Sequence, residues 1–247
     1  MTAPSGYRIL AYGEIDSTNS EAARLAASGA EDGTVVFARA QSAGRGRRGR
    51  TWASPEGNLY CSILLRPDCR AREALQLGFA AALAASEAIG AVVKGRVTLK
   101  WPNDVLIDGR KVAGCLLESE AGARERLSWL VIGFGVNVAS FPEGVEFPAT
   151  SLAAAGAAET SVEALRDAYL AAFTRWRAVW QREGFAPIRA AWLGVATGLG
   201  KDIRVRLERE TLAGRFSALD AEGGLVLALA DGSERIVTAG DIFSIAA

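Results

Sequence analysis

The segment Lys100-Trp101-Pro102-Asn103-Asp104-Val105-Leu106-Ile107-Asp108-Gly109-Arg110-Lys111-Val112-Ala113-Gly114 predicts the β-hairpin on which the main sheet is built. Its centre, Asp108-Gly109, is a strong signal for a two-residue type I′ turn, in which both residues have positive φ. Residues rich in β-formers lie on both sides of the turn and predict two strands, 97–107 and 110–118. The turn therefore joins two antiparallel neighbours.

The turn also sets the register of the hairpin. Leu106 is expected opposite Lys111, and Val105 opposite Val112. Because side chains alternate between the two faces of a sheet, every second residue shares a face. The residues expected together on one face are Asp104, Leu106, Lys111 and Ala113.

Asp104 and Lys111 are the pair in this hairpin that suggests chemistry. As diagonal neighbours their Cα atoms should lie roughly 7–8 Å apart. We expect that gap to be too wide to force an ion pair and suited to holding a phosphate and a metal ion between the two side chains. A carboxylate can hold Mg²⁺, and an ammonium can neutralise an α-phosphate. A cross-strand surface salt bridge is the alternative, and the adjoining Pro102-Asn103 segment favours a functional site.

A loop rich in arginine and glycine precedes the hairpin, between predicted strands 34–40 and 58–65. Its residues 44–52, named here the Arg-Gly loop, read Gly-Arg-Gly-Arg-Arg-Gly-Arg-Thr-Trp. Glycines let a ligand approach the backbone, and planar guanidinium groups suit carboxylates and phosphates. A solvated loop or an RNA contact are the alternatives. Since like charges and glycines cannot hold this loop alone, we expect it to be mobile when empty and to become ordered over a ligand.

A later predicted strand, 127–138, carries small residues on one face. Alternation places Gly133, Gly135 and Asn137 together, with apolar residues on the opposite, core-facing side. Glycine inside a strand often indicates that something packs closely against the backbone. A flat ligand would fit there, with Asn137 offering a donor and an acceptor. A β-bulge or tight packing against a helix is the alternative, and a ligand floor is the favoured interpretation.

Three hydrogen-bonding residues, Ser17-Thr18-Asn19, open a predicted helix at about 19–28. Thr18 with Glu21 matches a capping box, and Gly29 suits the position after the helix end. The same three residues, beside a helix N-terminus, could recognise a ureido or amide group.

Composition excludes several classes of function. The chain has no histidine, so mechanisms that need a His base and the usual zinc sites are ruled out. The 28 basic and 28 acidic residues give a formal net charge of +0, which disfavours a general nucleic-acid binder. Three cysteines without C-x-x-C spacing indicate reduced, buried thiols and a cytoplasmic protein. We find no signal peptide, and the apolar stretch 75–89 indicates a buried helix rather than a membrane span.

The predicted architecture is α+β in two parts. Residues 1–193 should form a mixed sheet with helices on one side, including long helices at 72–89 and 162–182. The second of these has a capping box, Thr160 to Glu163, and an aromatic stripe typical of a core face. Residues 194–247 contain short strands at 203–208, 212–219, 225–229 and 235–238, which predict a small SH3-like β-barrel.

These motifs, in this order, resemble those of the biotin–protein ligases. The resemblance is close from Tyr7 to about Val138 and is a general pattern beyond. The matching stretches are Ser17-Thr18-Asn19, Gln41-Ser42-Ala43 followed by Gly44 to Arg50, Trp52, Ser54-Pro55, Gly57-Asn58-Leu59-Tyr60, Lys100 to Asp104, Lys111-Val112-Ala113-Gly114, and Gly133 to Asn137.

The resemblance implies a role for each matched residue. The biotin site would comprise Ser17, Thr18, Asn19, Gln41, Gly44, Arg45, Gly46, Arg47, Lys111, Gly114, Gly133 and Gly135. The ATP site would comprise Arg45, Arg47, Arg50, Trp52, Asn103, Lys111 and Asn137. Lys111 would stabilise the pentavalent transition state, Arg47 would hold the carboxylate and α-phosphate, and Asp104 would help bind Mg²⁺ or orient the incoming lysine amine.

The same resemblance implies an activity, cofactors and partners. Biotin would be activated by ATP and Mg²⁺ to biotinyl-5′-AMP, then passed to a lysine on the biotin-carrier domain of a carboxylase. The predicted first strand begins near Tyr7, which leaves no room for an N-terminal helix-turn-helix, so we expect a monofunctional ligase without DNA binding. No membrane partner is expected, and a homodimer is possible. A lipoate ligase or octanoyltransferase on the same fold is the nearest alternative, and a nucleic-acid-binding module is more distant.

Overall fold

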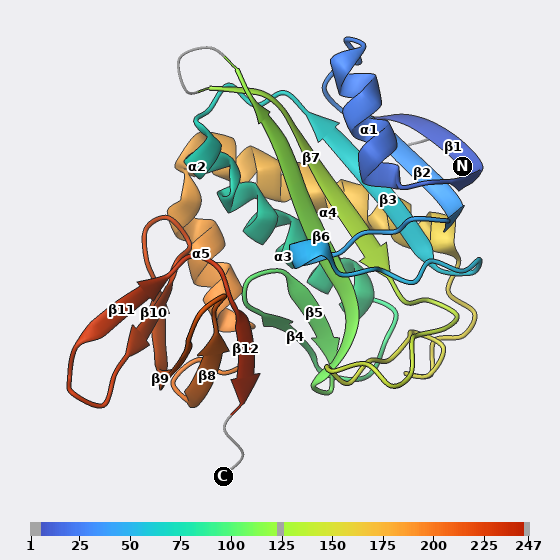
Figure 1. Cartoon of the computed structure of the whole chain (residues 1–247). Helices are drawn as coiled ribbons and strands as arrows, with labels where there is room; N and C mark the ends of the chain where they lie inside the picture. Colours follow the sequence, from blue (N-terminus) through green and yellow to red (C-terminus); the bar gives the residue numbers. More distant parts are fainter. Residues whose placement is uncertain (1–5, 123–125, 245–247) are drawn as a thin grey trace.

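Two β-sheets organise the computed structural model, which describes residues 6–122 and 126–244 (Figure 1). The larger sheet has seven strands, β1 (Arg8–Ile15), β2 (Thr34–Gln41), β3 (Leu59–Leu65), β4 (Val97–Lys100), β5 (Asp104–Ile107), β6 (Arg110–Ala121) and β7 (Leu127–Val136). Its helices are α1 (Thr18–Ala27), α2 (Ala71–Ala74), α3 (Gln76–Gly90), α4 (Val162–Glu183) and α5 (Phe185–Gly194), with a 3-10 turn η1 (Arg47–Gly49) in the Arg-Gly loop.

The spatial order of the large sheet is β1-β2-β3-β7-β6-β5-β4. Only β1 and β2 pair in parallel; every other described neighbour pair in this sheet is antiparallel. The predicted mixed sheet of an α+β protein is therefore confirmed. This order places β7, with its glycines, at the centre between β3 and β6.

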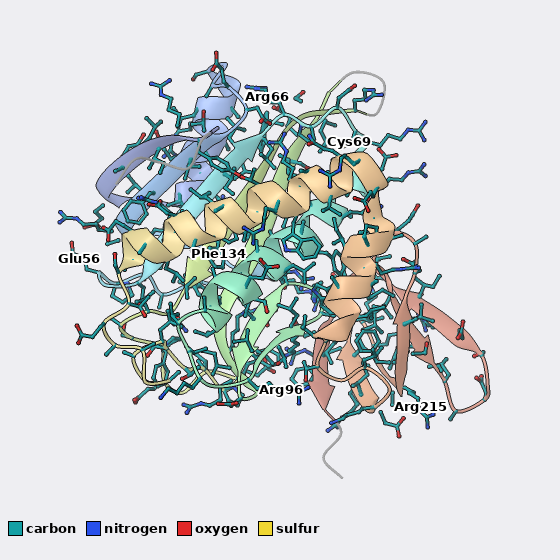
Figure 2. The ribbon with its side chains drawn as sticks, turned by 180° about the vertical axis from the view of Figure 1, so that it is seen from behind. Glu56, Arg66, Cys69, Arg96, Phe134 and Arg215 are labelled. Carbon is teal, nitrogen blue, oxygen red and sulfur yellow. The ribbon has the colours of Figure 1, made fainter. Side chains whose placement is uncertain are left out.

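The main core lies between the sheet and the long helices α3 and α4. Ile132, Phe134 and Val136 of β7 point into it and are at most 2% exposed, as their alternation predicts. Seen from behind, α4 crosses this face of the sheet with Phe134 beneath it (Figure 2), and the Phe134 ring stacks on Tyr169 at 4.0 Å between centroids. The predicted aromatic stripe of this helix is thus a core face.

The small helix α1 lies on the opposite face. Ala22 and Ala26 pack there on Val36, Leu64 and Val131, which alternate with the residues of the main core. The long helices α3 and α4 lie on one side of the sheet, as predicted, whereas α1 lies on the other side. Its N-terminus lies beside Gln41 at the end of β2, Ser62 of β3 and Gly133 of β7.

The hairpin differs from its prediction in two ways. The expected strand 97–107 is divided into β4 and β5, which pair with each other around residues 101–103. The turn itself is as predicted, with Asp108 at φ 47° and Gly109 at φ 78°. A β-bulge follows between Val105 and Leu106, so Val105 pairs with Ala113 instead of Val112.

Two helix starts are displaced by one residue from their predictions. Ser17, not Thr18, is the N-cap of α1, and Ser161, not Thr160, is the N-cap of α4. In each case two adjacent hydroxyl residues compete for the same role, and their sequences do not distinguish them. Gly29 has φ 86° after the end of α1, as expected.

The second sheet is small and antiparallel, with strand order β11-β10-β9-β8-β12. Its strands are β8 (Asp202–Arg206), β9 (Thr211–Leu219), β10 (Leu225–Ala228), β11 (Glu234–Val237) and β12 (Asp241–Ser244). Four of these strands were expected, and β12 was not. β12 pairs with β8 and is an edge strand of this sheet. It lies on the side towards β4 and β5 of the larger sheet (Figure 1).

Across the described helices, none combines the length and apolar character that a membrane crossing requires.

Candidate active site

A cavity of about 360 Å³ opens where the ends of β2, β5, β6 and β7 meet the Arg-Gly loop. Nearly all the residues predicted from the sequence line it. They are Ser17, Thr18, Asn19, Gln41, Arg45, Gly46, Arg47, Arg50, Trp52, Asn103, Asp104, Lys111, Gly114, Gly133, Gly135 and Asn137. Gly44 is not among the lining residues.

Gly44 instead has a structural position beneath the loop. A Cβ on this residue would collide with the Trp52 carbonyl and the Ser54 hydroxyl. The Gly44 carbonyl accepts a hydrogen bond from the Trp52 amide at 2.9 Å. Its missing side chain therefore allows the loop to fold back on itself.

One end of the cavity is lined by a connected polar network. Gln41 Oε1 accepts hydrogen bonds from the Thr18 amide and hydroxyl at 2.8 and 3.1 Å. Ser62, which is fully buried, lies with its hydroxyl 2.8 Å from Thr18 Oγ1 and 2.6 Å from Asn19 Oδ1. Asn19 Nδ2 donates to Glu118 Oε2 at 2.7 Å. These donors and acceptors are held in fixed positions, as recognition of a small polar ring system requires.

The two glycines of β7 form the floor of the cavity. At Gly133 a Cβ would collide with the Asn19 amide, and at Gly135 a Cβ would lie 2.8 Å from Trp52 Nε1. The predicted close approach is therefore real, and in the ligand-free chain Asn19 and Trp52 make it. Asn137 is buried, and its Nδ2 donates to the Thr150 carbonyl at 3.0 Å.

Asp104 and Lys111 form a direct ion pair, with Nζ 2.6 Å from Oδ1. The gap expected between the two side chains is therefore absent, and the cross-strand salt bridge given as the alternative is present. The β-bulge shifts the register, so Asp104 lies opposite Gly114, and the glycine leaves room for the flexible lysine to reach across. For the same reason Ala113 pairs with Val105 and is buried on the core face, not on the face of Lys111.

Each arginine of the Arg-Gly loop has a partner outside the loop, and Arg48 and Arg50 share one, Asp241. Arg45 Nη2 lies 2.7 Å from Glu118 Oε2, and Arg47 Nη1 lies 3.3 Å from Asn103 Oδ1. Burial lowers the pKa of Arg47 from its ordinary value. The expected mobility of the empty loop assumed that like charges had no such partners, and it stays a prediction.

Lys100 also faces the cavity and was not predicted as a site residue. Its Nζ lies 3.7 Å from the centre of the Phe147 ring, and burial lowers its pKa from the ordinary value. The sequence places Lys100 in the Lys-Trp-Pro-Asn-Asp motif, which could have identified it. Ser62, Glu118 and Asp241 were missed as well, and no local pattern marks them.

Comparison with known proteins agrees with this site. The profile described as the biotin/lipoate A/B protein ligase family matches residues 12–137, and the profile of the biotin protein ligase C-terminal domain matches residues 198–244. This chain belongs to the biotin protein ligase family. Among named relatives in the family, the biotin–[acetyl-CoA-carboxylase] ligase of Paracoccus denitrificans is 41% identical over 92% of this chain and 97% of its own.

More distant members of the biotin protein ligase family agree. The bifunctional ligase/repressor BirA of Bacillus subtilis is 34% identical over 96% of this chain and 74% of its own length. The solved biotin protein ligase from Aquifex aeolicus in complex with biotin and ATP is 28% identical, with a TM-score of 0.80 over 96% of this chain and 97% of its own. The fold and the site thus match the same family.

Proposed function

We propose that this chain activates biotin with ATP and transfers the biotinyl group to a lysine on the biotin-carrier domain of a carboxylase. The observation that carries the proposal is the cavity itself. It brings the polar network around Asn19, the glycine floor of β7 and the Lys111–Asp104 pair into one site. Its relatives with at least 30% identity over most of the chain are named biotin ligases or ligase/repressors.

In the first half-reaction a biotin carboxylate oxygen attacks the α-phosphorus of ATP. The bond to the β-phosphate oxygen breaks, and pyrophosphate leaves. The mixed anhydride biotinyl-5′-AMP results. Arg47 would hold the carboxylate beside the α-phosphate, and Lys111 would neutralise the charge that develops on the phosphoryl oxygens. Lys100, at the same cavity, would face the outer phosphates.

The ligand-binding assignments stay proposals for each residue. Biotin would lie over Gly133 and Gly135, with its ureido group against the polar network. The nucleotide would contact Trp52, Asn103 and Asn137, which share one part of the wall. The remaining assignments are those given with the family resemblance: Ser17, Thr18, Asn19, Gln41, Arg45, Gly46 and Gly114 for biotin, and Arg45 and Arg50 for ATP.

In the second half-reaction the amine of the acceptor lysine attacks the carbonyl carbon of the anhydride. The bond to the phosphate oxygen breaks, AMP leaves, and an amide remains. The amine must first lose a proton. Asp104 would orient it, since its carboxylate lines the cavity and is of the kind that attracts an amine, as its contact with the Lys111 ammonium group indicates.

Magnesium would bind with few protein ligands. Within residues 6–122 and 126–244, no three Cys, His, Asp or Glu side chains gather into a metal-binding group. Mg²⁺ commonly takes one or two carboxylates and completes its shell with substrate phosphates and water. Asp104 fits such a role as a single ligand, and the ion would supply charge neutralisation at the phosphates.

We propose further that the chain divides into two domains near 193/194, where α5 ends at Gly194. We also propose that the protein acts in the cytoplasm, since Cys61, Cys69 and Cys115 are all free and buried. A homodimer is also proposed. In the large sheet the edge strand β1 could pair between copies, whereas the outer side of β4 already hydrogen-bonds residues 195–197. Sedimentation of the purified chain would test this.

ATP–pyrophosphate exchange tests the central proposal. Purified protein with Mg²⁺ should catalyse exchange with biotin and not with lipoate or without an acid, and chelation of Mg²⁺ should abolish it. Exchange with lipoate would favour a lipoate ligase, and the absence of exchange with either acid would reject the adenylation step. Transfer to a purified biotin-carrier domain, followed by mass, then tests the second half-reaction.

A further inference from the structure

The C-terminal sheet delivers a buried carboxylate to the Arg-Gly loop. Asp241 begins β12 and is 9% exposed. Its Oδ1 accepts a hydrogen bond from Arg50 Nη2 at 2.7 Å, and its Oδ2 lies 3.4 Å from Arg48 Nη1. These contacts join the last described strand to a loop nearly two hundred residues earlier in the chain. A specific link between the two sheets therefore runs along the wall of the cavity.

Arg206 completes this group of charges. Its Nη2 lies 3.3 Å from Asp241 Oδ2, and its guanidinium makes a two-pronged contact with Glu146 at 2.6 and 2.9 Å. Burial opposes the charged form of Asp241, but the hydrogen bond from Arg50 and the neighbouring guanidinium groups outweigh it and lower the pKa. Asp241 is therefore an anion surrounded by three cations, and both loop arginines are drawn towards it.

The backbone of the loop shows what this contact holds in place. Arg48 has φ 56°, a left-handed conformation that a residue with a side chain adopts only when its surroundings compensate. The turn at Arg48 separates Arg47, which faces the cavity beside Asn103, from Arg50. Asp241 thus contacts Arg48 itself and Arg50, the two arginines that follow Arg47 in the loop.

We propose that Asp241 is a positioning residue that holds the Arg-Gly loop closed through Arg48 and Arg50, and so keeps Arg47 in the cavity. The C-terminal sheet is then part of the nucleotide site. The catalytic consequence rests on the proposed function, whereas loop closure does not. The sequence-based expectation that the empty loop is mobile stays a prediction, and digestion of the ligand-free protein tests both.

Limited trypsin digestion of the ligand-free protein tests loop closure directly, because trypsin cleaves after arginine. Asp241→Asn should increase cleavage within residues 45–50 about tenfold, the loss expected for one charge-assisted hydrogen bond. Asp202→Asn is the matched control, since Asp202 lies in the same sheet, is 67% exposed and is 3.9 Å from Arg215. Equal cleavage of the loop in the two variants would overturn the proposal.

A second variant guards against misfolding of the first. Arg48→Gln removes one partner of Asp241 from the other side and leaves the remaining arginines as cleavage sites. Arg48→Gln should also open the loop. Asp241→Asn introduced into the Arg48→Gln variant should then increase cleavage of the loop less than it does in the parent chain. Full additivity of the two substitutions would show that the residues do not act together.

Kinetics then separate positioning from a general structural role. In ATP–pyrophosphate exchange, Asp241→Asn should raise the KM values for ATP and for biotin about tenfold, because Arg47 is assigned to both ligands, whereas Asp202→Asn should change neither. Asp241→Glu, which keeps the charge, should recover part of the loss. A loss in Asp241→Asn that Asp241→Glu does not recover at all would mean that the substitution disrupts the whole site and would overturn the positioning role. If the parent chain shows no exchange, the proposed function fails and the trypsin result still decides loop closure.

Discussion

Lys111 and Asp104 form an ion pair across a β-bulge, with the lysine Nζ 2.6 Å from the carboxylate Oδ1. The bulge matters because it brings Asp104 opposite Gly114, where no side chain blocks the lysine. The pair fixes the ammonium group at the cavity wall before a phosphate arrives. A phosphate that binds Lys111 must therefore share it with Asp104.

Replacing Lys111 with alanine should reduce biotin-dependent pyrophosphate exchange at least about 100-fold, the usual cost of removing one preorganised group that stabilises a transition state. The melting temperature should change little, because the ion pair is partly exposed and such pairs contribute little to stability. Lys201→Ala, at an exposed lysine, is the control. Near-normal exchange in Lys111→Ala would refute the assigned role.

Gly133→Ala should weaken biotin binding by at least about tenfold, because the new methyl group displaces Asn19 from the polar network. Calorimetric titration with biotin measures this. Gly13→Ala is a matched control in β1, where a Cβ would make only an ordinary contact, 3.7 Å from Arg39 Nη2. Unchanged affinity for biotin in Gly133→Ala would mean that biotin binding does not require Asn19 in this position.

Trp52 should contribute through its ring rather than its N–H group. Its Nε1 is buried without a hydrogen-bond partner among the described residues, and its ring centre lies 5.3 Å from Lys111 Nζ. Trp52→Ala should raise the Kd for ATP roughly tenfold, as loss of base stacking does, and Trp52→Phe should not. An equal loss in both variants would instead assign the contribution to the N–H.

Asp32 should make stability depend on pH. It accepts two hydrogen bonds from Arg177 of α4, at 2.8 and 2.9 Å, and a third from the Arg66 amide at 2.8 Å. Burial opposes its charge, yet these bonds outweigh burial and place its pKa below the ordinary 3.8. A lowered carboxyl pKa stabilises the fold above the unfolded pKa, and the effect is lost as pH falls through the folded value.

Asp32→Asn should therefore lower the melting temperature by about 2 °C at pH 7, the size expected for a partly exposed ion pair in a chain of this length. The difference from the parent chain should shrink at acidic pH, below the lowered pKa of Asp32, where the parent's carboxylate is protonated as well. Thermal melts followed by circular dichroism at both pH values measure it. A difference that grows towards low pH would contradict the assigned direction.

Local signals in the sequence were sufficient for the parts of the site that lie on regular strands. The Asp-Gly turn, the alternation in β7 and the glycine floor all follow from periods and turn chemistry within ten residues. The two N-caps were missed by one position because each helix begins after adjacent hydroxyl residues, such as Ser17 and Thr18. The sequence pattern alone cannot decide which of two adjacent hydroxyl residues is the N-cap.

Contacts between distant segments could not be predicted in the same way. The β-bulge at Val105 depends on how β6 fits between two strands at once, and it reversed the expectation for Asp104 and Lys111. The strand β12 is four residues long and lacks strong alternation, so Asp241 had no local mark. Only the packing of the two sheets shows what it contacts.

The glycine floor also limits which acids this site could be altered to accept. Gly133 and Gly135 have no side chains to remove, so substitution there can only narrow the cavity. Room for a bulkier ring or a ring carrying a chemical label would have to come from the two side chains that rest on the floor, Asn19 and Trp52. Shortening Trp52 would widen the side towards Lys111, and shortening Asn19 would widen the opposite end. A search for variants that attach biotin analogues would therefore begin with these two positions.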